Sequence, residues 1–176
     1  MKRIAYPLFG VIMLLLVQAC QDRHGKNYNQ QTKVDQDGLS FLQNGIEGGN
    51  TEIKASGIAI TNSKNMRVIN FAKMMVDDHT QANEELKKIE KDKLVAEGDT
   101  INAEHHQKLT DLAKLNGGSF DKAYMQMMVD DHNSAIKLFT TASQNTDIEV
   151  RDFAAKTLPK LKMHLDSATA ISASLK

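Results

Sequence analysis

The hexapeptide MMVDDH occurs twice in this chain, at residues 74–79 and again at 127–132. The match extends beyond the six letters at the same offset, since Phe71 in the first copy corresponds to Tyr124 in the second. Apolar residues recur around both copies every three or four positions, which is the period of one face of an α-helix. The two copies therefore predict two helices that bury the same face.

The histidine of each hexapeptide falls within that apolar face. At about 100° per residue, His79 lies close to Met75 on the helix surface, and His132 bears the same relation to Met128. A histidine in this position is expected to point into the protein interior. The second aspartate of each copy, Asp78 or Asp131, falls at the flank of the apolar face, where it can orient a partner. The first aspartate, Asp77 or Asp130, is expected to face water.

The rest of the chain supports an all-α fold. Aromatic residues make up 5% of the sequence, Trp is absent and only two prolines occur, and this composition favours helices over sheet. Four long apolar stripes are readily buried in a four-helix bundle, with a short extra helix between the second and third long helices. The expected helices cover about 38–62, 64–94, 101–115, 119–143 and 148–174, with N-caps at Ser63, Thr100 and Ser119. The expected apolar stripe of the first helix runs from Leu39 to Ile60.

Polar groups from all four long helices are expected to meet inside the bundle. In the last helix His164 lies beside Leu161 on the inward side. In the first helix the spacing allows Glu52 to point inward but does not require it. Counting from the helix ends at about 1.5 Å per residue, these two residues and the two repeated histidines differ in height by roughly 10 Å or less. The predicted metal ligands are His79, His132, His164 and Glu52, surrounded by Asp78, Asp131, Met75 and Met128.

Two interpretations of this polar layer remain open. In the first it binds a transition metal, because imidazoles and carboxylates are metal ligands and bundle interiors often hold them. Three histidines and one carboxylate suit zinc or iron, whereas copper ranks lower because Met75 and Met128 fit equally well as core filler. In the second interpretation the Asp–His pairs hold the helices in register without an ion.

Other motifs give little sign of catalysis. The EHH stretch that contains His105 and His106 is expected at a solvated surface. The chain has no Gly-rich phosphate loop, no nucleophile elbow and no Glu-x-x-His pair of the kind used by di-iron centres. These absences favour a protein that is not an enzyme, although the sequence leaves the question open.

The N-terminal residues predict export. Two basic residues precede an apolar run over 8–17 that is shorter than the roughly 20 residues of a transmembrane helix. The run leads into VQAC, which places Cys20, the one cysteine in the sequence, where bacterial lipoproteins carry their lipid; a plain signal peptide with an incidental cysteine is the alternative. The expected organisation is a lipoprotein signal peptide at 1–19, a flexible tether at 20–36 and a bundle domain at 37–174.

Charge adds a constraint on partners. Lys and Arg together number 22, as do Asp and Glu, so the formal net charge is zero and no basic block indicates nucleic-acid binding. Attachment to a membrane is therefore expected through the lipid on Cys20. Because Gln21 rather than Asp follows this cysteine, we expect an outer-membrane lipoprotein of the bacterial cell envelope.

Three segments resemble a known family: FAKMMVDDHTQANEEL, LNGGSFDKAYMQMMVDDHNSAIKLF and LPKLKMHLDSA. They are similar to the bacterial domain-of-unknown-function family numbered 4142, whose members are often labelled outer-membrane proteins. The resemblance covers about residues 37–173 and implies a ferritin-like helical bundle with no established activity. The family's Asp–His pairs, late histidine and early acidic residue correspond here to Asp78, His79, Asp131, His132, His164 and Glu52.

The sequence thus predicts a cell-envelope lipoprotein with a buried histidine and carboxylate site. Its expected role is transition-metal binding for storage, sensing or stress protection. The alternative is a structural or interaction protein of the envelope, without metal, in which the Asp–His pairs only fix the packing of the bundle.

Overall fold

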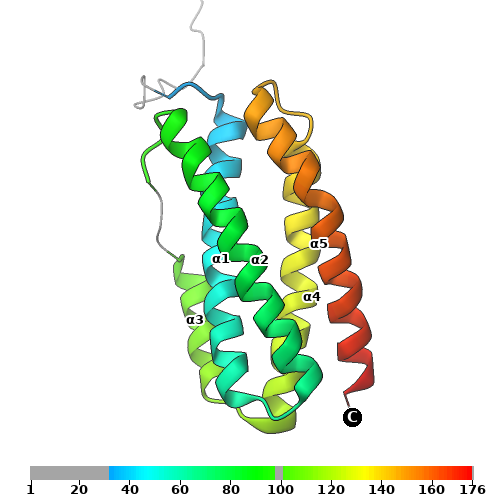
Figure 1. The fold of residues 1–176 in the computed structure, drawn as a ribbon. Helices are drawn as coiled ribbons and strands as arrows, with labels where there is room; N and C mark the ends of the chain where they lie inside the picture. The colour runs from blue at the N-terminus through cyan, green and yellow to red at the C-terminus, as the bar shows by residue number, and fades with distance from the viewer. Residues whose placement is uncertain (1–31, 98–100, 176) are drawn as a thin grey trace, which may run out of the picture. The chain divides into compact units, whose positions relative to one another are not determined.

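The computed structural model describes residues 32–97 and 101–175, and within these ranges the chain forms five α-helices (Figure 1). The predicted all-α bundle, with a short helix between the second and third long helices, is confirmed. The helices are α1 (Gln36–Asn62), α2 (Met66–Asp92), α3 (Ala103–Ala113), α4 (Gly117–Ala142) and α5 (Ile148–Ser174).

The four long helices form the corners of the bundle. Helix α1 packs against α2 and α4, and α5 packs against the same two helices, so α2 and α4 occupy opposite corners. These two helices run in the same direction, opposite to α1 and α5 (Figure 1). The short helix α3 lies against α1 and α4. As a consequence, the two copies of the hexapeptide approach the bundle centre from opposite sides.

Two of the predicted N-caps are wrong. The residue that caps α2 is Asn65, whose side chain accepts from Arg67 N, while Ser63 follows the end of α1 and accepts from Asn65 N at 3.0 Å. Helix α4 begins two residues before Ser119, so this serine lies inside its first turn. Asn and Ser cap helices about equally well, and local sequence alone does not choose between them. The third predicted cap, Thr100, lies outside the described residues, and α3 is capped by Asn102.

Apolar side chains form two clusters along the bundle. One contains Phe120 and Tyr124 near the α1–α2 turn, and the other contains Phe41 and Phe153 towards the opposite end. A polar layer separates the clusters, and its four residues are 0–7% exposed: Glu52, His79, His132 and His164.

The inward face of α1 differs from the prediction. Ile60 was expected in the apolar stripe but is 36% exposed, whereas Ala55, Ser56 and Ala59 are buried. The Ser56 hydroxyl forms a 2.8 Å hydrogen bond with the Tyr124 hydroxyl inside the core. Small side chains on α1 therefore line the face that packs against α4. Glu52 lies on the same buried face of α1.

The predicted signal peptide at 1–19 and the predicted lipidation site Cys20 lie outside the described residues, as does most of the tether predicted at 20–36. The last residues of that tether contact the end of α2, since Lys33 N donates to Lys93 O at 2.9 Å. Within the two described ranges, no helix combines the length and apolar character that a membrane crossing requires.

A candidate metal centre in the polar layer

Three histidines from three helices converge at one level of the bundle. His79 comes from α2, His132 from α4 and His164 from α5, and one ring nitrogen of each lies within 4.8 Å of the other two. Their exposed fractions are 7%, 0% and 1%. The predicted convergence of these imidazoles is confirmed, and a group of this kind could hold a metal ion.

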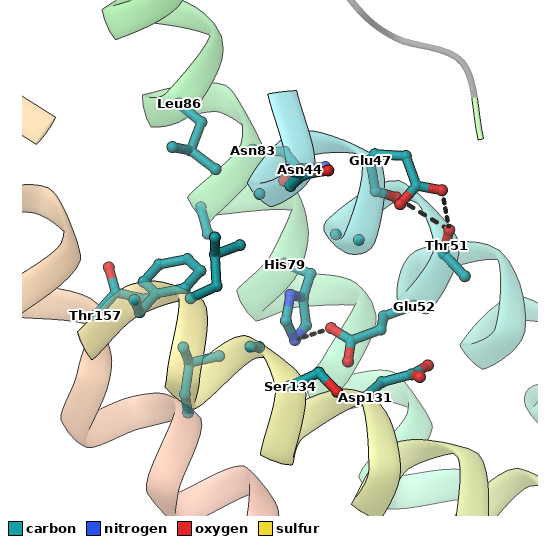
Figure 2. Close-up of a pocket in the computed structure, with 18 of the residues that line it drawn as sticks. Asn44, Glu47, Thr51, Glu52, His79, Asn83, Leu86, Asp131, Ser134 and Thr157 are labelled. Atoms are coloured by element: carbon teal, nitrogen blue, oxygen red, sulfur yellow. Dashed lines mark hydrogen bonds and ion pairs between the residues drawn. The ribbon is translucent and has the colours of Figure 1, made fainter. Parts of the chain in front are cut away.

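Glu52 reaches the same layer from α1 (Figure 2). Its Oε2 lies 2.9 Å from His79 Nε2, and its Oε1 lies 3.2 Å from His132 Nδ1. These short contacts are ion pairs without hydrogen-bond geometry: Glu52 Oε1 and His79 Nε2 are buried atoms that have no hydrogen-bond partner among the described residues. The structure thus brings the four predicted ligand residues together and leaves two of their polar atoms unsatisfied.

The tautomers of two rings follow from their outer partners. His132 Nδ1 lies 2.9 Å from the Met128 carbonyl oxygen, and His164 Nε2 lies 2.9 Å from Asp78 Oδ2. A carbonyl or an ionised carboxylate only accepts, so both of these ring nitrogens donate. In neutral rings the remaining nitrogens, His132 Nε2 and His164 Nδ1, then carry bare lone pairs that face each other at 3.3 Å. Two such lone pairs require a proton or a metal ion between them.

Electrostatics disfavour a proton on His164. Burial, reinforced by His79 and His132, lowers the pKa of His164 to about 4, although Asp78 opposes the shift. Burial raises the pKa of Glu52, but the neighbouring charges of His79 and His132 outweigh it and lower that pKa to about 2. Burial lowers the pKa of His79, but Glu52 outweighs it and raises that pKa. At neutral pH Glu52 is ionised and His164 is neutral, so His164 Nδ1 is the acceptor in its 3.3 Å contact with His132 Nε2.

The flanking aspartates have different surroundings. Asp78 accepts from His164 and, through Oδ1, from Lys160 Nζ at 2.8 Å, and these partners lower its pKa against the effect of burial. Asp131 lies near Glu52 (Figure 2), and its buried Oδ2 has no hydrogen-bond partner in the described part of the chain. Burial first and Glu52 second raise the pKa of Asp131 to about 6. Only the first aspartate orients a histidine.

The two methionines that precede the histidines belong to the apolar core. The side chains of Met75 and Met128 are fully buried in the cluster around Tyr124. Met128 nevertheless contributes to the site through its backbone carbonyl, which holds the His132 ring. A histidine four residues after any helical residue can reach that carbonyl, so this role follows from helix geometry rather than from sulfur chemistry.

A cavity of about 430 Å³ adjoins the polar layer, and Figure 2 shows side chains that line it. Its inner end is formed by Glu52, His79 and His164, and the residues of α3 that line it include His105 and Lys108. Its apolar wall includes three side chains of the second cluster: Leu86, Phe139 and Leu161.

Sequence reasoning missed an ion pair beside this cavity. His105 was expected at a solvated surface, but its Nδ1 lies 2.7 Å and 3.0 Å from the two carboxylate oxygens of Glu47 on α1. The available signal was that His105 is one turn before Leu109, a buried residue through which α3 packs on the bundle. The neighbouring His106 is exposed, as expected.

Comparison with known proteins gives a fold and a family. The chain is similar to the crystal structure of a DUF305 fragment from Deinococcus radiodurans, with a TM-score of 0.73 and 12% sequence identity over 81% of this chain and 99% of that chain. At this identity the likeness shows the fold alone. A comparison with the curated proteins found no match. The family described as "Domain of unknown function (DUF4142)" matches residues 25–171, and because this is most of the sequence, the chain belongs to that family.

Proposed function

We propose that this protein binds one transition-metal ion in the polar layer. The ligands are His132 Nε2, His164 Nδ1 and His79 Nε2, with Glu52 as the fourth. A single observation carries the proposal: the ring nitrogens of three buried histidines from three helices lie within 4.8 Å of one another, and those of His132 and His164 are 3.3 Å apart. Tetrahedral zinc with bonds of about 2.0–2.1 Å separates its ligand nitrogens by about 3.3 Å.

The outer hydrogen bonds support this assignment. A histidine that ligates a metal usually donates its other ring N–H to a carboxylate or a backbone carbonyl, which fixes the ring. Asp78 serves His164 in this way, and the Met128 carbonyl serves His132. Three nitrogens and one carboxylate oxygen suit zinc or iron. Copper ranks lower, because the methionine side chains belong to the apolar cluster.

A structural role for the polar layer is the second candidate. The contacts of Asp78 with His164, of Glu52 with His132 and of Glu52 with His79 join side chains of different helices directly. Such contacts can hold four helices in one register, as buried polar groups do in some coiled coils. In that case the protein acts through its surface and needs no metal.

Metal analysis of untagged protein, purified without chelator, separates the two candidates. We expect one ion per chain, lost in His79→Ala and in His132→Ala. The matched control is His106→Ala, which removes an exposed histidine and should keep the ion. Wild-type protein that is metal-free, and whose unfolding midpoint does not change when zinc or iron is added, would support the structural role and reject the metal site.

We further propose that this domain is held at the outer membrane of a bacterial cell envelope by lipid on Cys20, where it stores, senses or protects against metal ions. The VQAC box after an apolar run supports the anchor. In cell fractionation, Cys20→Ser should move the protein from the membrane to the soluble fraction. A variant that stays with the membrane would show that the anchor assignment is wrong.

A further inference from the structure

We infer that the cavity beside the polar layer is the path by which the ion reaches the histidines, and that Asp131 is the carboxylate that captures it on the way. This inference rests on the proposed metal site and adds a kinetic role for a residue outside its ligand set.

The cavity has the size and position of a path. Residues of α3, including His105 and Lys108, line it together with Glu52, His79 and His164 of the polar layer. Its volume of about 430 Å³ exceeds that of a divalent ion with six waters, since each water occupies about 30 Å³ in the liquid. An ion can therefore move through the cavity with its hydration shell and exchange waters for protein ligands at the inner end.

Most charged groups that line the cavity already have partners. Glu47 holds His105, and Asp78 holds both His164 and Lys160. The carboxylate of Glu104 pairs with Lys108 Nζ at 3.0 Å. An ion that passes these groups would have to break an existing contact to bind them.

Two lining carboxylates each have a buried oxygen that forms no hydrogen bond among the described residues. These atoms are Oδ2 of Asp131 and Oε1 of Glu52, and Glu52 Oε1 lies 3.2 Å from His132 Nδ1 without hydrogen-bond geometry. The two side chains lie near each other on α4 and α1 (Figure 2). Two unsatisfied acceptor oxygens attract a cation, and carboxylate oxygens readily replace the waters of a hydrated metal ion.

Asp131 lies outside the final ligand set. The nitrogens that share the centre belong to the three histidines. Because Asp131 lines the same cavity as His79 and His164, an ion held by its carboxylate can move on to the imidazoles without leaving the cavity. Its negative charge therefore raises the rate at which the site fills and has little effect on how tightly the filled site holds the ion.

Stopped-flow mixing of the metal-free full chain with Co²⁺ tests this role through the visible absorption of the bound ion. We expect Asp131→Asn to fill about 10-fold more slowly than wild type, with a weaker dependence on salt. The final spectrum and the stoichiometry should remain those of wild type. Asp130→Asn, which removes the neighbouring exposed charge, should fill at the wild-type rate, and Asp131→Glu should restore most of the rate.

The possible results separate the two proposals. If Co²⁺ binds and Asp131→Asn fills as fast as wild type and Asp130→Asn, the capture role is wrong and the metal site stands. If Asp131→Asn also lowers the stoichiometry or changes the final spectrum, Asp131 is a ligand of the ion and the capture role is again wrong. If wild-type protein binds neither Co²⁺ nor zinc, both the site and the path are rejected.

Discussion

The two copies of MMVDDH have the same letters but different chemical surroundings. In α2, Asp78 lies beside His164 of the neighbouring helix α5, which donates a hydrogen bond to it at 2.9 Å. In α4, Asp131 lies beside Glu52 of the neighbouring helix α1 (Figure 2). The ionised carboxylate of Glu52 offers only acceptor oxygens. The same aspartate is therefore satisfied in one copy and unsatisfied in the other. The partner on the next helix, rather than the hexapeptide itself, decides its role.

The difference extends to charge. The pKa of Asp78 is lowered because Lys160 and His164 overcome its burial, whereas burial and Glu52 raise the pKa of Asp131 to about 6. One copy thus supplies a positioning residue for the proposed metal centre, and the other supplies a carboxylate that is costly to keep ionised without a cation. The following predictions test that contrast.

The largest expected effect is on metal affinity. Asp78→Asn removes the acceptor that fixes the His164 ring, and loss of such a partner typically weakens metal binding by about 10–100-fold. Asp131→Asn should leave the dissociation constant within about twofold of wild type, since no hydrogen bond joins Asp131 to a proposed ligand. Competition against a chromophoric chelator measures the metal dissociation constants of both variants. The control is Asp77→Asn, which changes an exposed aspartate. Equal losses in the two variants would remove the proposed asymmetry.

Acid stability of the metal-free protein is the second test. The pKa of folded His164 is about 4, below its ordinary 6.5, so its contribution is present above pH 6.5 and is lost as the pH falls towards 4. We expect a loss of about 2 kcal/mol from this group. The raised pKa of Asp131 acts in the opposite direction, because its protonation below pH 6 stabilises the fold. Urea unfolding across pH 4–7 should therefore show a steeper loss for Asp131→Asn than for wild type.

The third effect is on stability at pH 7 without metal. Asp131→Asn removes a buried charge that repels Glu52, and we expect it to raise the free energy of unfolding by about 1 kcal/mol. Asp78→Asn should lower the free energy of unfolding, because it breaks contacts with His164 and Lys160. Denaturant unfolding at pH 7 measures the free energy of unfolding of both variants. At pH 4 the increase in this free energy caused by Asp131→Asn should disappear. A gain that persists at pH 4 would show that repulsion of the ionised carboxylate is not its cause.

The smallest effect is expected at the methionines that both copies share. Met75→Leu and Met128→Leu conserve volume in the core and should cost less than about 1.5 kcal/mol each. Neither should change the metal content, because Met128 holds His132 through its backbone and both side chains lie in the apolar cluster. Thermal unfolding and metal analysis check this. A loss of metal in either variant would indicate that sulfur participates in the site.

Much of the fold was predictable from local patterns. The apolar stripes located four long helices and one short one, and distances from the helix ends placed Glu52 and the three histidines at one level. The errors were also local in character. Ser63 was predicted as a cap in place of Asn65, and Ile60 was predicted inside, because stripes and capping preferences leave an ambiguity of a few residues or a fraction of a turn.

The pairings within the site were less predictable. The contact between Glu47 and His105 joins residues 58 positions apart, and the contact between Asp78 and His164 joins residues 86 positions apart. Helical periodicity gives the direction in which each side chain leaves its own helix but not the residue it meets on another. For that reason the sequence indicated two equivalent aspartates, and the structure shows two different ones.

By itself, the sequence determined that this chain forms amphipathic helices and that a histidine of each hexapeptide points inward, since both follow from the spacing of residues along one helix. Only the tertiary structure decided that Asp78 meets a donor while Asp131 meets an acceptor, that ring nitrogens of His132 and His164 lie 3.3 Å apart, and that a cavity borders the polar layer. These features depend on which helices are neighbours and how closely they pack, and no local pattern specifies that.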